Sequence, residues 1–173
     1  MNEIERIISE GFWDRSFLEP ETICDFYVDE ARKKIWLISL DLLREFDRVC
    51  RKHGLRYFIY GGTLLGAVRH HGFIPWDDDI DVAMLREDYS RLLSYADEFT
   101  SPYFLQSPKT DKGYFFSYNK LRNVNTSRVS KTFMYEKFCQ GMALDIFPFD
   151  FCNEYDGQDK FNRVRSLILD LST

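Results

Sequence analysis

The sequence lacks both an excess of basic charge and any long apolar run. Its 23 Lys and Arg residues are outnumbered by 28 Asp and Glu residues, which gives a formal net charge of −5. Surfaces that bind duplex nucleic acid usually carry a basic excess, so we expect no nucleic-acid partner. No apolar stretch approaches the roughly 20 residues of a membrane-spanning helix, so we expect no integral membrane segment. The charged N-terminus does not resemble a signal peptide, which favours a cytoplasmic location.

Cysteine pairs, repeats and low-complexity tracts are also missing. The four cysteines show no C-x-x-C spacing, so we expect reduced and mostly buried thiols rather than a disulfide framework or a zinc site. Hydrophobic residues make up 45% of the chain and aromatic residues 17%, enough for one folded domain. Residues 1–29 are only weakly periodic. We therefore expect an N-terminal arm followed by one domain over residues 30–173.

Hydrophobic periodicity predicts an α+β domain built on a mixed sheet. A long amphipathic helix is expected over Glu30–His53, with Gly54 as its C-terminal stop. Shorter helices are expected at Thr63–His70, Arg86–Phe99 and Gln158–Leu171. Strands are expected at Leu55–Tyr60, Asp79–Leu85, Tyr103–Gln106, Tyr114–Arg122 and Met142–Phe147, the last of them ended by Pro148.

A cluster of aspartates marks the most unusual part of the sequence, at Asp77, Asp78, Asp79 and Asp81. Side chains two residues apart on a strand share a face, so Asp79 and Asp81 should project together. Two carboxylates on one rigid element suit a hard cation such as Mg²⁺ or Mn²⁺. A solvated acidic loop is the other interpretation. The apolar segments on both sides of the run favour the metal site.

Asp145 is a candidate third carboxylate. It stands alone within the apolar segment 142–149, where a buried unpaired carboxylate would be costly. One interpretation is a hydrogen-bonded structural residue at a strand end. The other places its strand beside that of Asp79 and Asp81, so that all three carboxylates converge on metal ions.

Gly61-Gly62-Thr63 is a candidate phosphate-binding turn, because it follows a predicted strand and precedes a predicted helix. A lone glycine pair is weak evidence, but the aspartate cluster that follows strengthens it. Arg69 either neutralises a transferred phosphoryl group or is an ordinary surface residue. Lys120 and Arg122 either reach donor phosphates or are exposed strand cations.

The two blocks 60–70 and 72–82 together closely resemble the LicD family, and Asp145–Asp150 resembles that family's third block. The resemblance extends over roughly Glu30–Asp150. It implies the DNA polymerase β-like nucleotidyltransferase fold, in which helices flank a mixed sheet, and a relationship to the fukutin-type transferases.

The resemblance also implies roles for individual residues. Gly61, Gly62 and Thr63 would hold donor phosphate, with Arg69 and Lys120 as further substrate-binding candidates. Asp79 and Asp81 would be metal ligands. Asp145 would share a metal and help to deprotonate the acceptor.

The implied reaction moves phosphocholine, or a similar phospho-alcohol, from a CDP-alcohol donor to a hydroxyl of a glycan or lipid-linked sugar acceptor. Such acceptors belong to teichoic acid, lipopolysaccharide or capsule. A lipid-linked acceptor would place the protein at the inner face of the membrane. LicD proteins usually continue well beyond the third acidic block, so acceptor-binding elements are expected to be missing or shortened here.

Two alternatives come from other classes of protein. A nucleotide-sugar-dependent glycosyltransferase would use Asp-x-Asp to hold Mn²⁺, but it needs several βα units that have no room before Asp79. A non-catalytic nucleotidyltransferase-like binding domain is the second alternative. The presence of Asp79, Asp81 and Asp145 weighs against it, and the short C-terminus weighs for it.

Overall fold

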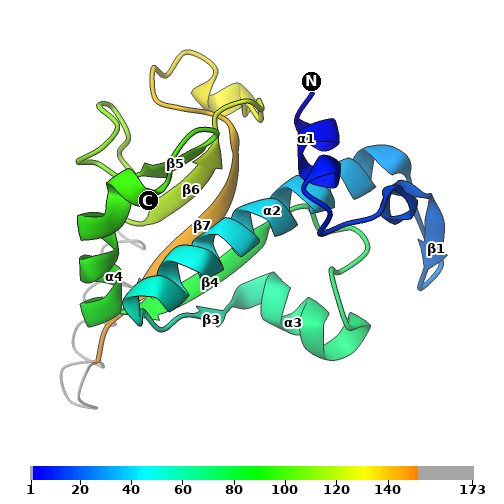
Figure 1. Cartoon of the computed structure of the whole chain (residues 1–173), viewed down its shortest axis with the longest axis horizontal. Helices are drawn as coiled ribbons and strands as arrows, with labels where there is room; N and C mark the ends of the chain where they lie inside the picture. The colour runs from blue at the N-terminus through cyan, green and yellow to red at the C-terminus, as the bar shows by residue number, and fades with distance from the viewer. Residues whose placement is uncertain (1, 152–173) are drawn as a thin grey trace, which may run out of the picture.

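A mixed five-stranded sheet forms the centre of the protein (Figure 1), whose computed structural model describes residues 2–151. The strand order is β3-β4-β7-β6-β5. Strands β4 and β7 pair in parallel, and the other neighbours are antiparallel. The predicted α+β class is thereby confirmed. The strands are β3 (Phe58–Ile59), β4 (Ile80–Leu85), β5 (Tyr103–Gln106), β6 (Asn119–Asn123) and β7 (Met142–Phe149).

One long helix, α2, crosses the sheet and supplies much of the core (Figure 1). The Asp29 side chain caps its first turn by accepting a hydrogen bond from the Arg32 amide, and Gly54 ends it in the left-handed conformation. Its length, Glu30–His53, agrees with the prediction. The other helices are α1 (Glu3–Ser9), α3 (Gly61–His70) and α4 (Arg86–Leu92), with 3₁₀ turns at Arg15–Leu18, Leu93–Glu98 and Lys131–Phe133.

Apolar and charged side chains alternate along the central strands, so the two faces of the sheet differ in character. Ile80, Val82 and Met84 are buried in one cluster with residues of α2. Asp81 belongs to the opposite face, and its register partner across the parallel pair is Asp145. On the other side of β7, Lys120 of β6 is also a register partner of Asp145. The face turned away from α2 therefore collects acidic and basic side chains.

Three predicted boundaries near the sheet were wrong. The strand expected over 55–60 is reduced to Phe58–Ile59, because only these residues pair with β4. Helix α3 begins at Gly61, which brings the glycine pair into its first turn. Strand β7 continues through Pro148 to Phe149. Strand β6 pairs with β7 only as far as Ile146, so the proline lies where β7 has a neighbour on one side only.

Two other elements also differ from the prediction. Strand β6 begins at Asn119 rather than at residue 114, because its pairing with β5 and β7 covers only 119–123. In the segment before it, the Tyr114 hydroxyl donates to the Tyr118 carbonyl. The helix expected over 86–99 breaks after Leu92 into a 3₁₀ turn. The helix expected over 158–171 lies outside the described residues.

The N-terminal segment contributes directly to the core. Ile7 and Leu18 belong to the main buried cluster, and Val28 is also fully buried. Val28 is the last residue of a small hairpin formed by β1 (Glu21–Ile23) and β2 (Phe26–Val28). Weak periodicity did not indicate these buried positions. The division of the chain at residue 29 stays a prediction.

A buried carboxylate ties the N-terminal helix to α2 and β5. Asp41 is fully buried and accepts hydrogen bonds from Arg6 (2.6 Å), Arg44 (2.7 Å) and the Tyr103 hydroxyl (2.8 Å). Glu10 also contacts both arginines. Because Arg6 comes from α1 and Tyr103 from β5, this one carboxylate joins three separate elements.

Within residues 2–151, no helix has the length and apolar character needed to cross a membrane. Three cysteines in this part of the chain are free, as predicted, but only Cys50 is fully buried. Cys24 is exposed and Cys139 is half-buried, so the expectation of mostly buried thiols was wrong for these residues. Cys152 lies outside the described residues.

Asp41→Ala should lower the free energy of unfolding by about 3–5 kcal/mol, because two arginines would lose a buried charged partner. Lys34→Ala is the control on the same helix. It removes an exposed ion pair with Glu30 and should cost less than about 1 kcal/mol. Urea unfolding of both variants measures the difference, and equal losses would contradict this role for Asp41.

Candidate active site

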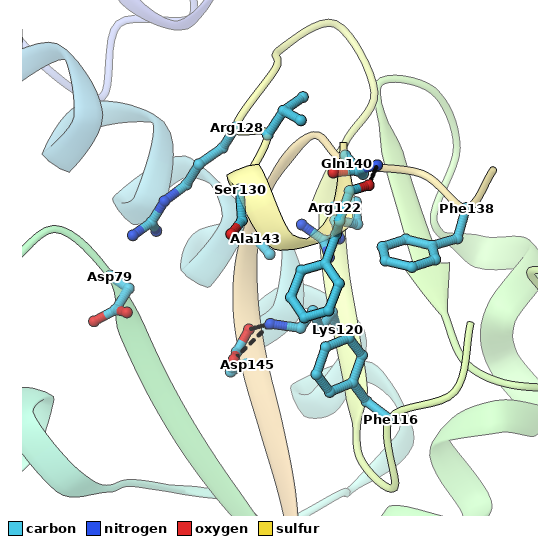
Figure 2. A pocket seen from close by; sticks show the side chains of 12 residues that line it. Asp79, Phe116, Lys120, Arg122, Arg128, Ser130, Phe138, Gln140, Ala143 and Asp145 are labelled. Atoms are coloured by element: carbon cyan, nitrogen blue, oxygen red, sulfur yellow. Dashed lines mark hydrogen bonds and ion pairs between the residues drawn. The ribbon is translucent and has the colours of Figure 1, made fainter. Parts of the chain in front are cut away.

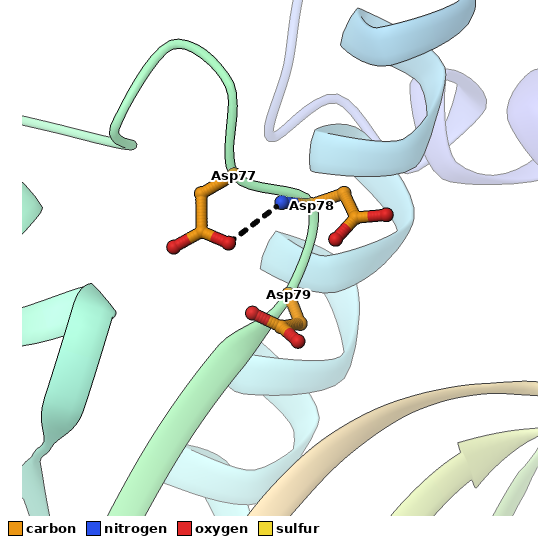
Figure 3. A group of neighbouring side chains, drawn as sticks. All are labelled: Asp77, Asp78 and Asp79. Carbon is orange, nitrogen blue, oxygen red and sulfur yellow. Dashed lines mark hydrogen bonds between the residues drawn. The ribbon is translucent and has the colours of Figure 1, made fainter.

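Three neighbouring carboxylates lie in the loop that enters β4 (Figure 3). Asp77, Asp78 and Asp79 each offer an oxygen within 4.8 Å of the others. The Asp78 amide donates to the Asp77 carboxylate at 3.1 Å. Burial, reinforced by the charge of Asp77, raises the pKa of Asp79 above its usual range. The negative charge of this loop is therefore only partly offset within the protein.

Asp81 continues the acidic group along β4. Burial raises its pKa to about 6, and the charges of Asp79, Asp145 and Asp77 act in the same direction. A bound cation would stabilise the ionised form of a carboxyl group that burial and neighbouring negative charge otherwise keep protonated. All of these donors are hard carboxylate oxygens, the ligand type that Mg²⁺ and Mn²⁺ prefer. The donor set thus fits a divalent cation.

The start of helix α3 packs directly against these carboxylates. A Cβ atom at Gly62 would lie 2.7 Å from an Asp77 carboxylate oxygen, and one at Gly61 would lie 3.1 Å from that of Asp81. Gly61 also has a φ of +57°, which favours glycine. The Thr63 hydroxyl accepts a hydrogen bond from the Asp81 amide at 2.8 Å. The Gly-Gly-Thr motif therefore fixes the spacing between α3 and β4.

Two side chains of α2 hold the acidic loop from the other side. Trp36 Nε1 and the Arg32 guanidinium both donate to the Asp77 carbonyl, at 2.8 and 3.0 Å. The Trp36 ring also stacks on Phe73 with centroids 4.8 Å apart. Sequence reasoning missed both residues. Their spacing of four on one predicted helix was the available signal, but nothing in the sequence linked that face to the loop.

On β7, Asp145 is held by Lys120 of the neighbouring strand (Figure 2). The Lys120 ammonium lies 2.7 Å from both oxygens of the carboxylate. It also lies over the rings of Phe116 and Tyr118, at 5.7 and 5.1 Å from their centroids. Lys120 is therefore a half-buried counter-ion of a site carboxylate rather than an exposed strand cation.

Arg128 is a further cation that sequence analysis did not select. It comes from the loop after β6 and forms an ion pair with Asp78 at 3.0 Å. Figure 2 shows its side chain extending toward Asp79. Its charge lowers the pKa of Asp79 and so opposes the effects of burial and of Asp77. No motif marks this residue, because only the folded loop brings it to the acids.

Two cavities meet at Asp79. The first, of about 300 Å³, lies on the face of the sheet turned away from α2 and is also lined by Asp145, Lys120 and Arg128. The second, of about 430 Å³, is mostly apolar and is lined by Gly62, Thr63, Asp77, Trp36, Phe73 and other residues. A substrate in either cavity would contact the acidic group.

The structure brings most of the predicted site residues together. Asp81 and Asp145 are register partners, while Asp79 and Asp145 line the same cavity. The tightest carboxylate group is nevertheless Asp77, Asp78 and Asp79. Arg69 is exposed, and its Nε donates to His70 Nδ1 at 3.3 Å rather than to any acidic residue among those described. The catalytic, metal and substrate-binding roles stay predictions.

A family model described as LicD/FKTN/FKRP, nucleotidyltransferase domain, matches residues 54–167. The chain is also 51% identical over 57 residues to the lipopolysaccharide cholinephosphotransferase LicD of Haemophilus influenzae. That match covers 33% of this chain and 22% of the relative. An uncharacterized protein of Rickettsia prowazekii is 32% identical over 135 residues, 78% of this chain and 41% of that protein.

Similarity extends to a human protein as well. The ribitol 5-phosphate transferase FKRP of Homo sapiens is 47% identical over 53 residues, which is 28% of this chain and 11% of FKRP. In each of these comparisons the matched region spans less than half of the relative's length.

Thr63→Val should lower the free energy of unfolding by about 1–3 kcal/mol, because the Asp81 amide would lose its hydrogen-bond acceptor. Thr63→Ser retains the hydroxyl and is the matched control, with most of the stability kept. Urea unfolding at neutral pH distinguishes the two. A valine variant as stable as the serine variant would show that the hydroxyl does not hold α3 to β4.

The raised pKa of Asp81 predicts that this residue contributes a loss of stability to the metal-free protein as the pH rises from about 4 to about 6. Over this range the unfolded carboxyl ionises first, so ionisation favours unfolding. The shift corresponds to about 3 kcal/mol, which partial solvent exposure reduces to roughly 1–2 kcal/mol. Asp81→Asn should therefore be more stable than the wild type at pH 7.5 and no more stable at pH 4.

Thermal unfolding in a chelating buffer, with the exposed Asp97→Asn as control, measures this difference. An Asp81→Asn variant that is less stable than the wild type at pH 7.5 would contradict the raised pKa of Asp81 and its assignment to burial and neighbouring charge.

Proposed function

The chain belongs to the LicD/FKTN/FKRP family, within its nucleotidyltransferase domain, and we propose that it transfers phosphocholine or a similar phospho-alcohol. The proposed donor is a CDP-alcohol, and the proposed acceptor is a hydroxyl of a cell-surface glycan precursor such as teichoic acid, lipopolysaccharide or capsule. The observation that carries the proposal is the parallel pairing of β4 with β7. It aligns Asp81 with Asp145 inside the region that the family model matches.

Asp79, Asp81 and Asp145 are the proposed ligands of a divalent cation, Mg²⁺ or Mn²⁺. The adjacent Asp77 and Asp78 add negative charge within 4.8 Å of Asp79 and would strengthen the attraction. Bound there, such cations would supply Lewis-acid stabilisation of the phosphoryl group and would acidify the attacking hydroxyl.

The proposed transfer forms a bond between the acceptor oxygen and the phosphorus that carries the alcohol. The bond from this phosphorus to the bridging oxygen breaks, and CMP leaves. Asp145 accepts the proton of the acceptor hydroxyl at a carboxylate oxygen. Since Lys120 engages both of those oxygens at 2.7 Å, it must first release one. The released ammonium is then available to a donor phosphate.

Gly61, Gly62 and Thr63 are proposed to hold donor phosphate through the first turn of α3, whose amides have no acceptor within the helix. The Thr63 oxygen already accepts from Asp81, and its hydroxyl hydrogen stays available to a phosphate oxygen. Arg69 is the weakest member of the predicted set. It would have to leave His70 to reach a substrate.

The sheet topology weighs against the glycosyltransferase alternative. A nucleotide-sugar-binding Rossmann half needs several parallel strands, whereas the seven described strands contain a single parallel pair. The non-catalytic alternative is an outcome of the experiment below. A lipid-linked acceptor would bring the protein to the inner face of the membrane.

The double variant Asp79→Asn/Asp81→Asn should lose Mg²⁺-dependent binding of CDP-alcohols, because two of the proposed ligands lose their charge. Calorimetric titration with CDP-choline, CDP-ethanolamine and CDP-ribitol, with and without Mg²⁺, measures the effect. We expect binding to the wild type to weaken at least about tenfold without Mg²⁺.

Asp97→Asn, an exposed aspartate outside the site, is the matched control and should bind like the wild type. A folded wild type that binds none of the three donors would favour the non-catalytic alternative. If the double variant binds the CDP-alcohols as tightly as the wild type in the presence of Mg²⁺, the metal must be bound by other residues.

A further inference from the structure

The first cavity has a basic wall and an aromatic wall (Figure 2). Lys120, Arg122 and Arg128 contribute the positive charge, and Phe116, Phe133 and Phe138 contribute the rings. Its volume of about 300 Å³ is at the lower end of the range typical of small-molecule sites. Among the described residues, the acidic side chains in its lining are Asp79 and Asp145, both proposed to bind the cation. Once they do, the remaining lining is strongly positive.

Arg122 is unusual among these cations because it is buried without an ion-pair partner among the described residues. It is only 7% exposed, and among residues 2–151 it forms no ion pair. Its Nε donates to Gln106 at 2.8 Å and its Nη1 to the Gly141 carbonyl at 2.6 Å. No hydrogen-bond partner for Nη2 occurs within this described part of the chain. A buried guanidinium held only by neutral groups is costly, and an anion in the cavity would compensate its charge.

A buried hydrogen-bond network fixes the orientation of this guanidinium. The Gln106 amide that accepts from Arg122 donates in turn to Asp111 at 2.7 Å and to the Cys139 carbonyl at 2.9 Å. The Cys139 amide donates to the same Asp111 carboxylate at 2.8 Å. Arg122 is thereby preorganised, and an incoming anion would find its donor in place.

Lys120 and Arg128 supply charge that can change partners. Lys120 is bound to Asp145, and Arg128 to Asp78 at 3.0 Å. A cation bound by Asp79, Asp81 and Asp145 would compete with Lys120 for Asp145 and would weaken the attraction between Arg128 and Asp79. The two side chains could then bind phosphate oxygens at the mouth of the cavity, near Asp79. Fixed and movable cations together suit a ligand with more than one phosphate group.

The aromatic wall selects against a cationic head group. The Lys120 ammonium already lies over Phe116, so a quaternary ammonium here would meet three like charges. A flat nucleobase carries no such penalty, and stacking on aromatic rings is how bases are commonly held. Phe133 is half-buried and lies edge-on to Phe116 with centroids 5.4 Å apart, which leaves part of its ring available.

We infer that this cavity binds the nucleoside diphosphate part of the donor, with Arg122 and Arg128 on the phosphates and Phe133 against the base. The choline or polyol group is held outside the basic wall. This inference rests on the proposed function, because the donor is taken from it. It selects the phosphate-binding role for Arg122, adds Arg128 and Phe133 as donor-binding residues and assigns the first cavity to the donor nucleotide.

Calorimetric titration with CDP, cytidine and inorganic phosphate, all in the presence of Mg²⁺, tests the assignment. Arg128→Gln should weaken CDP binding by roughly tenfold to hundredfold, the range for losing a charged hydrogen bond, and should leave the weaker cytidine binding unchanged. Phe133→Leu should weaken CDP and cytidine by the same factor, at least about fivefold. Arg122→Lys should weaken CDP binding as well, provided that urea unfolding shows it folded.

Arg91→Gln is the matched control, because Arg91 is an equally exposed arginine that pairs with an aspartate outside the cavity. It should bind CDP like the wild type. Unchanged CDP binding by Arg128→Gln would overturn the inference while leaving the transferase proposal intact. Inorganic phosphate binding as tightly as CDP would also overturn it, in favour of a phosphate on the acceptor. A wild type that binds no CDP-alcohol would remove the transferase proposal itself.

Discussion

Electrostatic repulsion between carboxylates is the constraint on which the rest of this structure depends. Asp77, Asp78, Asp79 and Asp81 follow one another at the start of a central strand, and the sheet places Asp145 beside them. The protein offsets this charge only in part. Lys120 neutralises Asp145 and Arg128 neutralises Asp78, while burial and the remaining acids raise the pKa of Asp81 to about 6. The residual charge is what suits the site to a divalent cation.

The acidic loop keeps its shape because side chains of α2 and α3 hold its backbone in place. Trp36 and Arg32 of α2 bind its backbone, and Thr63 binds the backbone of Asp81. The glycine pair lets α3 approach the carboxylates more closely than any side chain would allow. These contacts leave the carboxylate oxygens themselves available to a ligand.

The parts of the site that are local in sequence could be predicted, and the parts that depend on sheet order could not. Strand periodicity alone placed Ile80 and Val82 in the core and Asp81 on the other face. The bidentate contact between Lys120 and Asp145 required the register of β6 against β7, which no local pattern encodes. Arg128 and Trp36 were missed for a related reason, since each reaches the acids from an element distant in sequence. The substrate-binding role of Arg69 stays a prediction, because the helical step that brings it near Gly66 does not decide which way its side chain points.

The last described strand is also a central one. Strand β7 lies between β4 and β6, so the chain must complete 142–149 before the two halves of the sheet can join. Asp81 and Asp145 thus meet only through a contact of high sequence separation, the kind that forms late in folding. Partly synthesised or partly folded chains would carry the aspartate run without its partner strand. The site would then assemble only when the sheet is complete. A chain that stopped before β7 could not form the site.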